Sequence, residues 1–154
     1  MSRKIILSYS PLYFSERDAG SSKQIINYYT NASPTTALPQ GQALSVNSSG
    51  LLVPLDITNQ ISWSNFVGYA FVRIPTSSEG QVISNGRLVN FTTALAIGTP
   101  LYIGLDGNPT ATIPSTDNGF PSGALAIFLG VIVPNELNPS EKDISLFTQF
   151  IDVL

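Results

Sequence analysis

The sequence of 154 residues contains no cysteine and no histidine. Without cysteine the chain has neither disulfide bonds nor a thiolate nucleophile. Without histidine it lacks the side chain that most often moves protons at neutral pH and most often binds transition metals. Histidine- and cysteine-based zinc sites, Ser-His-Asp triads and Cys-His dyads are therefore excluded, and the sequence predicts no metal and no cofactor.

Charged residues are also scarce, at 11% of the chain, whereas soluble domains usually contain about 25%. The net charge is −3, and Arg3-Lys4 is the only basic cluster. Nucleic-acid binding relies on neutralising several phosphates, so this composition argues against a nucleic-acid partner and against an anionic membrane surface. Neutral polar side chains cost less to desolvate than ions, and a surface covered with them suits close contact with other proteins.

Long apolar runs are missing as well. The N-terminal run Ile5-Ile6-Leu7 is too short for the core of a signal peptide. No run approaches the length of about 20 residues that a membrane-spanning helix needs. We therefore expect a protein that is made in a cytoplasm and does not cross a membrane.

Glycine and proline are plentiful, with 12 and 11 residues spread along the chain. Between them lie short segments rich in β-branched, aromatic and aliphatic residues, a pattern typical of a β-sandwich or β-barrel. We predict an all-β fold of short antiparallel strands, with a hairpin turn at Asn85-Gly86 and further turns at Asn47–Gly50 and Asp106-Gly107. The strand candidates are Gln42–Val46, Leu51–Pro54, Phe66–Ile74, Gln81–Ile83, Arg87–Thr92, Leu101–Ile103, Ala124–Val133 and Ile144–Ile151.

Two stretches of the chain resemble each other. Gly41 and Gly50 recur 57 positions later as Gly98 and Gly107, whereas Gly68 recurs 62 positions later as Gly130. This change of offset implies about five extra residues in the second copy, for which the loop 114–122 has room. The pattern fits a duplicated β-module over residues 41–92 and 98–151, although hairpin proteins also resemble themselves by chance.

Residues 1–37 differ from the β domain that we predict over residues 38–154. They form an irregular N-terminal arm in this interpretation, and a short helix over 15–29 is the alternative. The arm is aromatic, and aromatic side chains with polar neighbours are typical anchors of protein interfaces. It would lie either on a partner chain or on its own barrel. Its candidate contact residues are Tyr9, Tyr13, Phe14, Tyr28 and Tyr29.

The single tryptophan, Trp63, allows two interpretations. A sugar-binding module would stack a pyranose ring on its indole, whereas in a structural protein it fills a core or a subunit interface. We favour the second, because sugar sites usually combine several exposed aromatic rings with polar donors.

The sequence contains no recognisable catalytic motif. Most carboxylates lie in predicted turns beside glycine, serine or asparagine, and there is no Gly-x-Ser-x-Gly elbow or glycine-rich phosphate loop. A pair of carboxylates, as in a glycosidase, is the most plausible enzymatic arrangement that the composition leaves open. We therefore predict that the protein is not an enzyme.

Residues 79–91 and 95–112 resemble the small capsid decoration (cement) proteins of tailed bacteriophages. Those chains pair a glycine-turn hairpin with a stretch of the type Gly-x-x-Leu-Tyr and end in a glycine-led apolar strand, as at Leu129–Val133. The similarity covers about residues 40–133, and related stretches occur in other phage particle proteins, including parts of tail fibres.

The resemblance implies a structural virion protein, often a homotrimer, on the capsid surface. Such a protein binds the major capsid protein on the outside of the head and stabilises contacts between capsomers, and it has no active site. The alternative is a receptor- or glycan-binding module of a phage tail or head fibre, in which Trp63 would contact the ligand.

Overall fold

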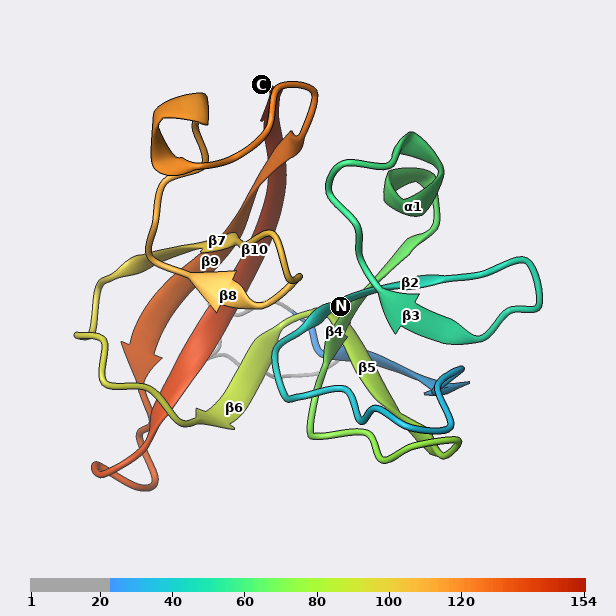
Figure 1. Cartoon of the computed structure of the whole chain (residues 1–154). Helices are drawn as coiled ribbons and strands as arrows, with labels where there is room; N and C mark the ends of the chain where they lie inside the picture. The colour runs from blue at the N-terminus through green and yellow to red at the C-terminus, as the bar shows by residue number, and fades with distance from the viewer. Residues whose placement is uncertain (1–22) are drawn as a thin grey trace, which may run out of the picture.

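Short strands separated by glycine and proline turns build two antiparallel five-stranded sheets in the computed structural model, which describes residues 23–154. The first sheet contains, in spatial order, β1 (Ile25–Thr30), β5 (Glu79–Asn85), β4 (Phe66–Ala70), β2 (Ala43–Val46) and β3 (Leu52–Pro54). The second contains β6 (Arg87–Phe91), β10 (Lys142–Val153), β9 (Leu125–Pro134), β7 (Pro100–Ile103) and β8 (Pro109–Thr110). The predicted all-β class is confirmed, and the two sheets lie side by side (Figure 1).

The two sheets share one topology. Adding five to each strand number of the first order, 1-5-4-2-3, gives the second order, 6-10-9-7-8. The registers agree as well, because Leu44 lies opposite Gly68 and Leu101 lies opposite Gly130, and a β-bulge follows both pairs. The molecule therefore consists of two β-modules with the same fold, one for each sheet.

Both modules begin earlier in the chain than the predicted repeats at residues 41–92 and 98–151, since their first strands start at Ile25 and Arg87. Strand β6 at residues 87–91 belongs to the second sheet, although the sequence offsets assigned it to the first copy. The Asn85-Gly86 hairpin prediction is wrong, since β5 and β6 lie in different sheets and do not pair. Gly86 is instead the joint between the modules, whereas the turns at Asn47–Gly50 and Asp106-Gly107 do connect paired strands.

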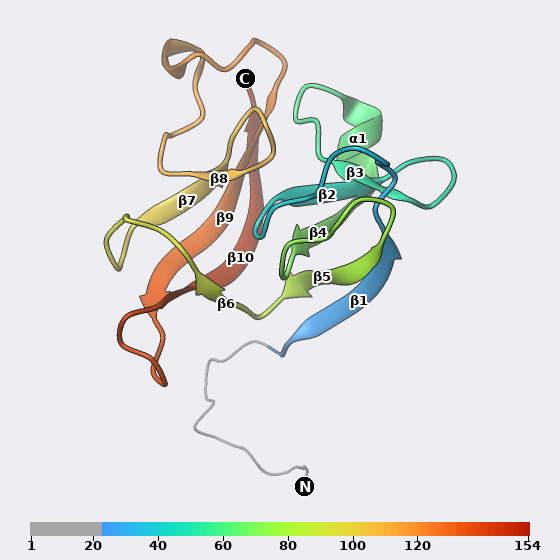
Figure 2. The ribbon, with the colours of Figure 1, turned by 60° about the horizontal axis from the view of Figure 1, so that its bottom comes forward.

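The described part of the predicted N-terminal arm is also more regular than expected. Residues 25–30 form strand β1, which pairs with β5 from Ile25 to Thr30, so neither an irregular arm nor a helix holds for this part. Figure 2 shows β1 along the outer side of the first sheet. The first sheet curls until Asn31, directly after β1, forms a bridge with Leu52 in β3.

The modules pack together around one large core. Ala43, Tyr69 and Ile83 of the first sheet share this core with residues of the second sheet such as Leu101 and Ile132. A smaller core lies inside the curled first sheet and contains Leu38, Leu44, Leu52, Ala70, Ile74 and Val82. One face of the first sheet thus packs on the second module, and its other face packs on its own loops.

A segment of the first module, residues 40–43, fills the space between the two edge strands of the second sheet. Gly41 has φ +86°, and a Cβ atom there would lie 3.0 Å from the Phe91 ring in β6 and 3.2 Å from Pro109 in β8. The segment can lie this close to both edge strands because residue 41 has no side chain.

Hydrogen bonds hold this segment in place on both sides. The Gln40 side chain donates to the carbonyl of Val89 in β6 at 2.9 Å. The Ala43 amide donates to the carbonyl of Gly107 at 2.8 Å, and the Gln42 side chain donates to that of Asp106 at 2.9 Å. The two modules are therefore joined by directed hydrogen bonds as well as by apolar contact.

Candidate interaction site

Three of the predicted contact residues, Tyr9, Tyr13 and Phe14, lie outside the described residues. Of the remaining arm residues, Tyr28 is 61% exposed and accepts a hydrogen bond of 3.2 Å from the Gln81 side chain through its hydroxyl. Tyr29 is half-buried against the smaller core. Because successive residues of a strand point to opposite faces, Tyr28 is the tyrosine of β1 that a partner can reach.

Trp63 lies in the short helix α1 (Gln60–Ser64), whose N-terminus is capped by the Asn59 side chain. The ring is half-buried against the large core, and its indole N–H donates to the carbonyl of Ile57 at 2.7 Å. It also borders a depression of about 580 Å³ that Asp56 and Asn59 help to line. The indole N–H is already occupied, so a ligand in this depression would meet only part of the ring.

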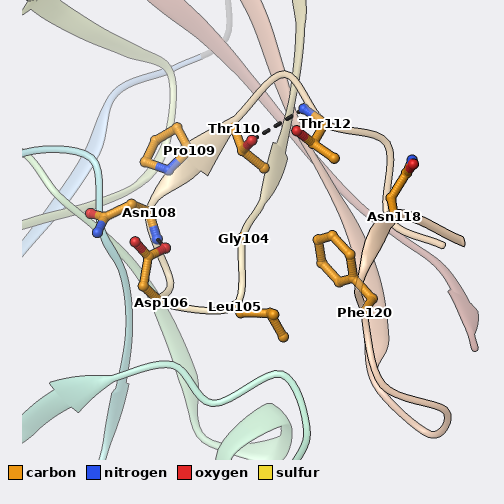
Figure 3. Close-up of a pocket in the computed structure, with 9 residues that line it drawn as sticks. All are labelled: Gly104, Leu105, Asp106, Asn108, Pro109, Thr110, Thr112, Asn118 and Phe120. Atoms are coloured by element: carbon orange, nitrogen blue, oxygen red, sulfur yellow. Dashed lines mark hydrogen bonds between the residues drawn. The ribbon is translucent and has the colours of Figure 1, made fainter. Parts of the chain in front are cut away.

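A second depression, of about 460 Å³, lies beside the β7–β8 turn (Figure 3). The Asp106 carboxylate accepts a hydrogen bond from the Asn108 amide at 2.9 Å, and this bond holds the pKa of Asp106 below its ordinary value. In the same loop, the Thr112 amide donates to the Thr110 hydroxyl at 3.1 Å. These contacts stabilise the loop and place no general base beside a nucleophile.

The most buried carboxylate of the described residues belongs to Asp143, which is 4% exposed. It pairs with Arg87 at 2.9 Å and also accepts hydrogen bonds from the Asn90 amide and the Asn135 side chain. This network connects β6, β10 and the end of β9, so its role is structural. Among residues 23–154, acidic side chains do not form a group of three that could hold a metal ion.

A surface that the sequence did not lead us to expect lies on the side of the second sheet that faces away from the large core. We call it the outer face, and its apolar and small residues are Pro100, Tyr102, Phe128, Val131, Val133, Ser145 and Phe147. Arg87, Asp143 and Gln149 lie on the same face, opposite Ser145, Val133 and Phe128. The rings of Tyr102 and Phe128 meet edge to face with centroids 5.7 Å apart. Phe147 lies between Leu146, which is in the core, and Thr148, which reaches Tyr69, and it is 68% exposed.

A signal for this surface was present in the sequence. The run Leu125–Val133 is apolar at every position except Gly130, and such continuous runs are typical of strands that are covered on both faces. In the structure only one face of β9 is covered by the core, and Phe128, Val131 and Val133 on the other are half-exposed. The prediction of a strand from this run was correct, but it took no account of the uncovered side.

The fold is that of a two-module antiparallel β protein. No protein-family model matches the chain, and neither does any curated protein or solved structure. In the described part of the chain, none of the helices is long and apolar enough to span a membrane.

Proposed function

We propose that this chain is a structural virion protein that decorates the capsid of a tailed bacteriophage. It binds the major capsid protein on the outer surface of the head and stabilises contacts between capsomers. In this role the protein is a structural component of the particle and not an enzyme.

The observation that carries the proposal is the position of Tyr28. This exposed ring lies on β1, and β1 is paired with β5 along its length, so the ring is held by a sheet. The preceding residues include three of the predicted aromatic anchors, Tyr9, Tyr13 and Phe14. A contact residue that a sheet already holds in place suits binding to a shell, because an ordered side chain loses little conformational entropy on binding.

The low charge of the chain supports the same role. A decoration protein must cover shell surface without desolvating many ions, and charged residues make up only 11% of this sequence. The resemblance of residues 40–133 to cement proteins points in the same direction.

The first test is immunogold electron microscopy of phage particles with an antibody against this chain. Gold distributed evenly over the heads is expected, whereas gold confined to tails or fibres would contradict the proposal. The second test measures binding of the full chain to shells that lack it. A deletion of residues 1–22 and the substitution Tyr28→Ala should each weaken binding.

The deletion must end at residue 22, because β1 begins at Ile25 and is an integral strand of the first sheet. A matched control is Leu137→Ala, since Leu137 is 97% exposed in the loop between β9 and β10. If the control and Tyr28→Ala weaken shell binding equally, β1 does not take part in the contact with the shell.

A receptor- or glycan-binding module of a tail or head fibre is the second candidate. The observation that favours it is that Trp63 borders a polar depression together with Asp56 and Asn59. Under this alternative, Trp63→Ala would abolish binding to host cells or host polysaccharide and leave shell binding unchanged.

A further inference from the structure

Equivalent rows of residues are buried in the first module and exposed or half-exposed in the second. In the first sheet Ala43, Tyr69 and Ile83 lie side by side across β2, β4 and β5, and all three are 0% exposed. The equivalent row of the second sheet, across β7, β9 and β10, is Pro100, Val131 and Ser145. Pro100 and Ser145 are exposed and Val131 is half-exposed.

The buried row owes its burial to the other module. Ala43, Tyr69 and Ile83 belong to the large core that the second sheet completes. The molecule therefore contains one example of how this face of the module is covered, and the cover is another module of the same fold. The outer face of the second sheet is the same kind of surface without its cover.

The composition of the outer face fits a protein interface. Its aromatic pair, Tyr102 and Phe128, together with Phe147, supplies the type of ring that anchors interfaces. The ions at this face are largely compensated, because Arg87 pairs with Asp143, and Asp152 lies only at one end, opposite Ala126. Apolar faces of this kind are more typical of contacts between identical subunits than of transient contacts.

We propose that the outer face of the second sheet is a self-association surface and that its occupant is a second copy of this chain. A second copy is favoured because the equivalent row is already covered by a module of this fold and because the face offers no unpaired charge at its centre to select a charged partner. The outer face is also continuous with the contact between the modules, because both include β10. This strand carries Phe147 on the outer face, and its Phe150 ring packs against the ring of Phe66 in the first module, with the two ring centroids 6.2 Å apart. The inference does not depend on the proposed function.

The test is sedimentation equilibrium of the full chain and of two variants. Phe147→Lys places a charge at the most exposed ring of the outer face. Leu137→Lys places the same charge on an equally apolar but more exposed side chain away from the sheet. The wild-type chain and Leu137→Lys should form the same oligomer, whereas Phe147→Lys should weaken self-association by more than about tenfold, because truncated or charged anchors typically cost this much or more.

Thermal unfolding of a dilute Phe147→Lys sample shows whether the variant is folded. If it is not, Ser145→Cys provides a second measurement, because the chain has no other cysteine and Ser145 is exposed. A nitroxide label at this position should show a short distance between copies by dipolar electron paramagnetic resonance, whereas a label at Leu137→Cys should not.

A monomeric wild-type chain, or an oligomer that Phe147→Lys leaves unchanged, would overturn the proposal. Shell binding is measured separately. A monomeric chain that binds shells through Phe147 would mean that the capsid covers this face, which removes the self-association surface but keeps the proposed function. An oligomer that does not bind shells would contradict the proposed function and keep the self-association surface.

Discussion

The hydroxyl of Tyr69, in the first module, and the hydroxyl of Thr148, in the second, form a hydrogen bond of 2.7 Å. Tyr69 is 0% exposed, and burial raises the pKa of its phenol well above the ordinary value, although the bond to Thr148 acts in the opposite direction. The bond joins residues 79 positions apart and lies in the core that both sheets share. It therefore reports on whether the two modules are correctly packed.

We predict that Tyr69→Phe lowers the free energy of unfolding by about 1 kcal/mol, the net contribution of a typical hydrogen bond. Thr148→Val should have a similar effect. Urea denaturation of the two single variants and the double variant gives the coupling energy. A coupling energy near zero would mean that the bond does not form in solution.

The raised pKa of Tyr69 also predicts alkaline sensitivity. A group whose pKa is higher in the folded state stabilises the fold below the pKa of the unfolded group, about 10 for tyrosine, and this contribution is lost as the pH rises further. The free energy of unfolding should therefore fall above pH about 10. The fall should be shallower in Tyr69→Phe than in the wild-type chain, and parallel curves would contradict the prediction.

Acid should weaken the fold through two exposed aspartates. Hydrogen bonds from the Thr58 hydroxyl and the Thr58 amide lower the pKa of Asp56, and one from the Asn108 amide lowers the pKa of Asp106 below that of an ordinary aspartate. A lowered pKa contributes stability above the pKa of the unfolded group, about 4, and this stability is lost as the pH falls through the folded value. Asp106→Asn should flatten this part of the pH dependence in thermal unfolding, and an unaltered slope would rule out a contribution from Asp106.

Gly68 and Gly130 are predicted to be the glycines least tolerant of alanine. They have φ values of +140° and +159°, and a Cβ at either would collide with a backbone carbonyl of the neighbouring strand, that of Ile83 or Ser145. Gly68→Ala should cost about 3 kcal/mol, because backbone strain and overpacking each contribute about 1–3 kcal/mol.

Gly50→Ala is the matched control for this prediction. Gly50 has φ +77°, but a Cβ atom at this position would have no other atom within 4 Å, so alanine there should cost only about 1–2 kcal/mol from the left-handed backbone. Equal losses at Gly68 and Gly50 in chemical denaturation would show that the close approach of the strands is unimportant.

The segment that joins the modules predicts a further stability effect. The Gln40 side chain donates to the carbonyls of Phe71 and Val89, so Gln40→Ala leaves two acceptors unpaired and should cost about 1–2 kcal/mol. Gln60→Ala, at an exposed position in α1, should cost less than about 0.5 kcal/mol. Hydrogen exchange should show faster opening of β6 in the Gln40 variant, because Val89 lies in that strand.

Local sequence patterns were sufficient for the fold class and most strands, and they indicated the duplication without deciding it. Each of the eight short apolar segments overlaps an observed strand, and the offsets of 57 and 62 align the bulges of the two sheets. These features depend on turn residues and on the spacing of apolar side chains, which act over a few positions. The absence of histidine and cysteine likewise limits the chemistry of the chain whatever its fold.

Long-range packing decided the remaining features. Asn85-Gly86 has the composition of a hairpin turn, but β5 and β6 pair with β1 and β10, so the dipeptide became the joint between two sheets. Strand β1 was missed, and its pairing with β5 joins residues 49 to 60 positions apart. The equivalent rows at Ala43 and Pro100 differ in burial because only one of them faces the other module, and what covers a face depends on the arrangement of whole sheets, which a local pattern does not encode.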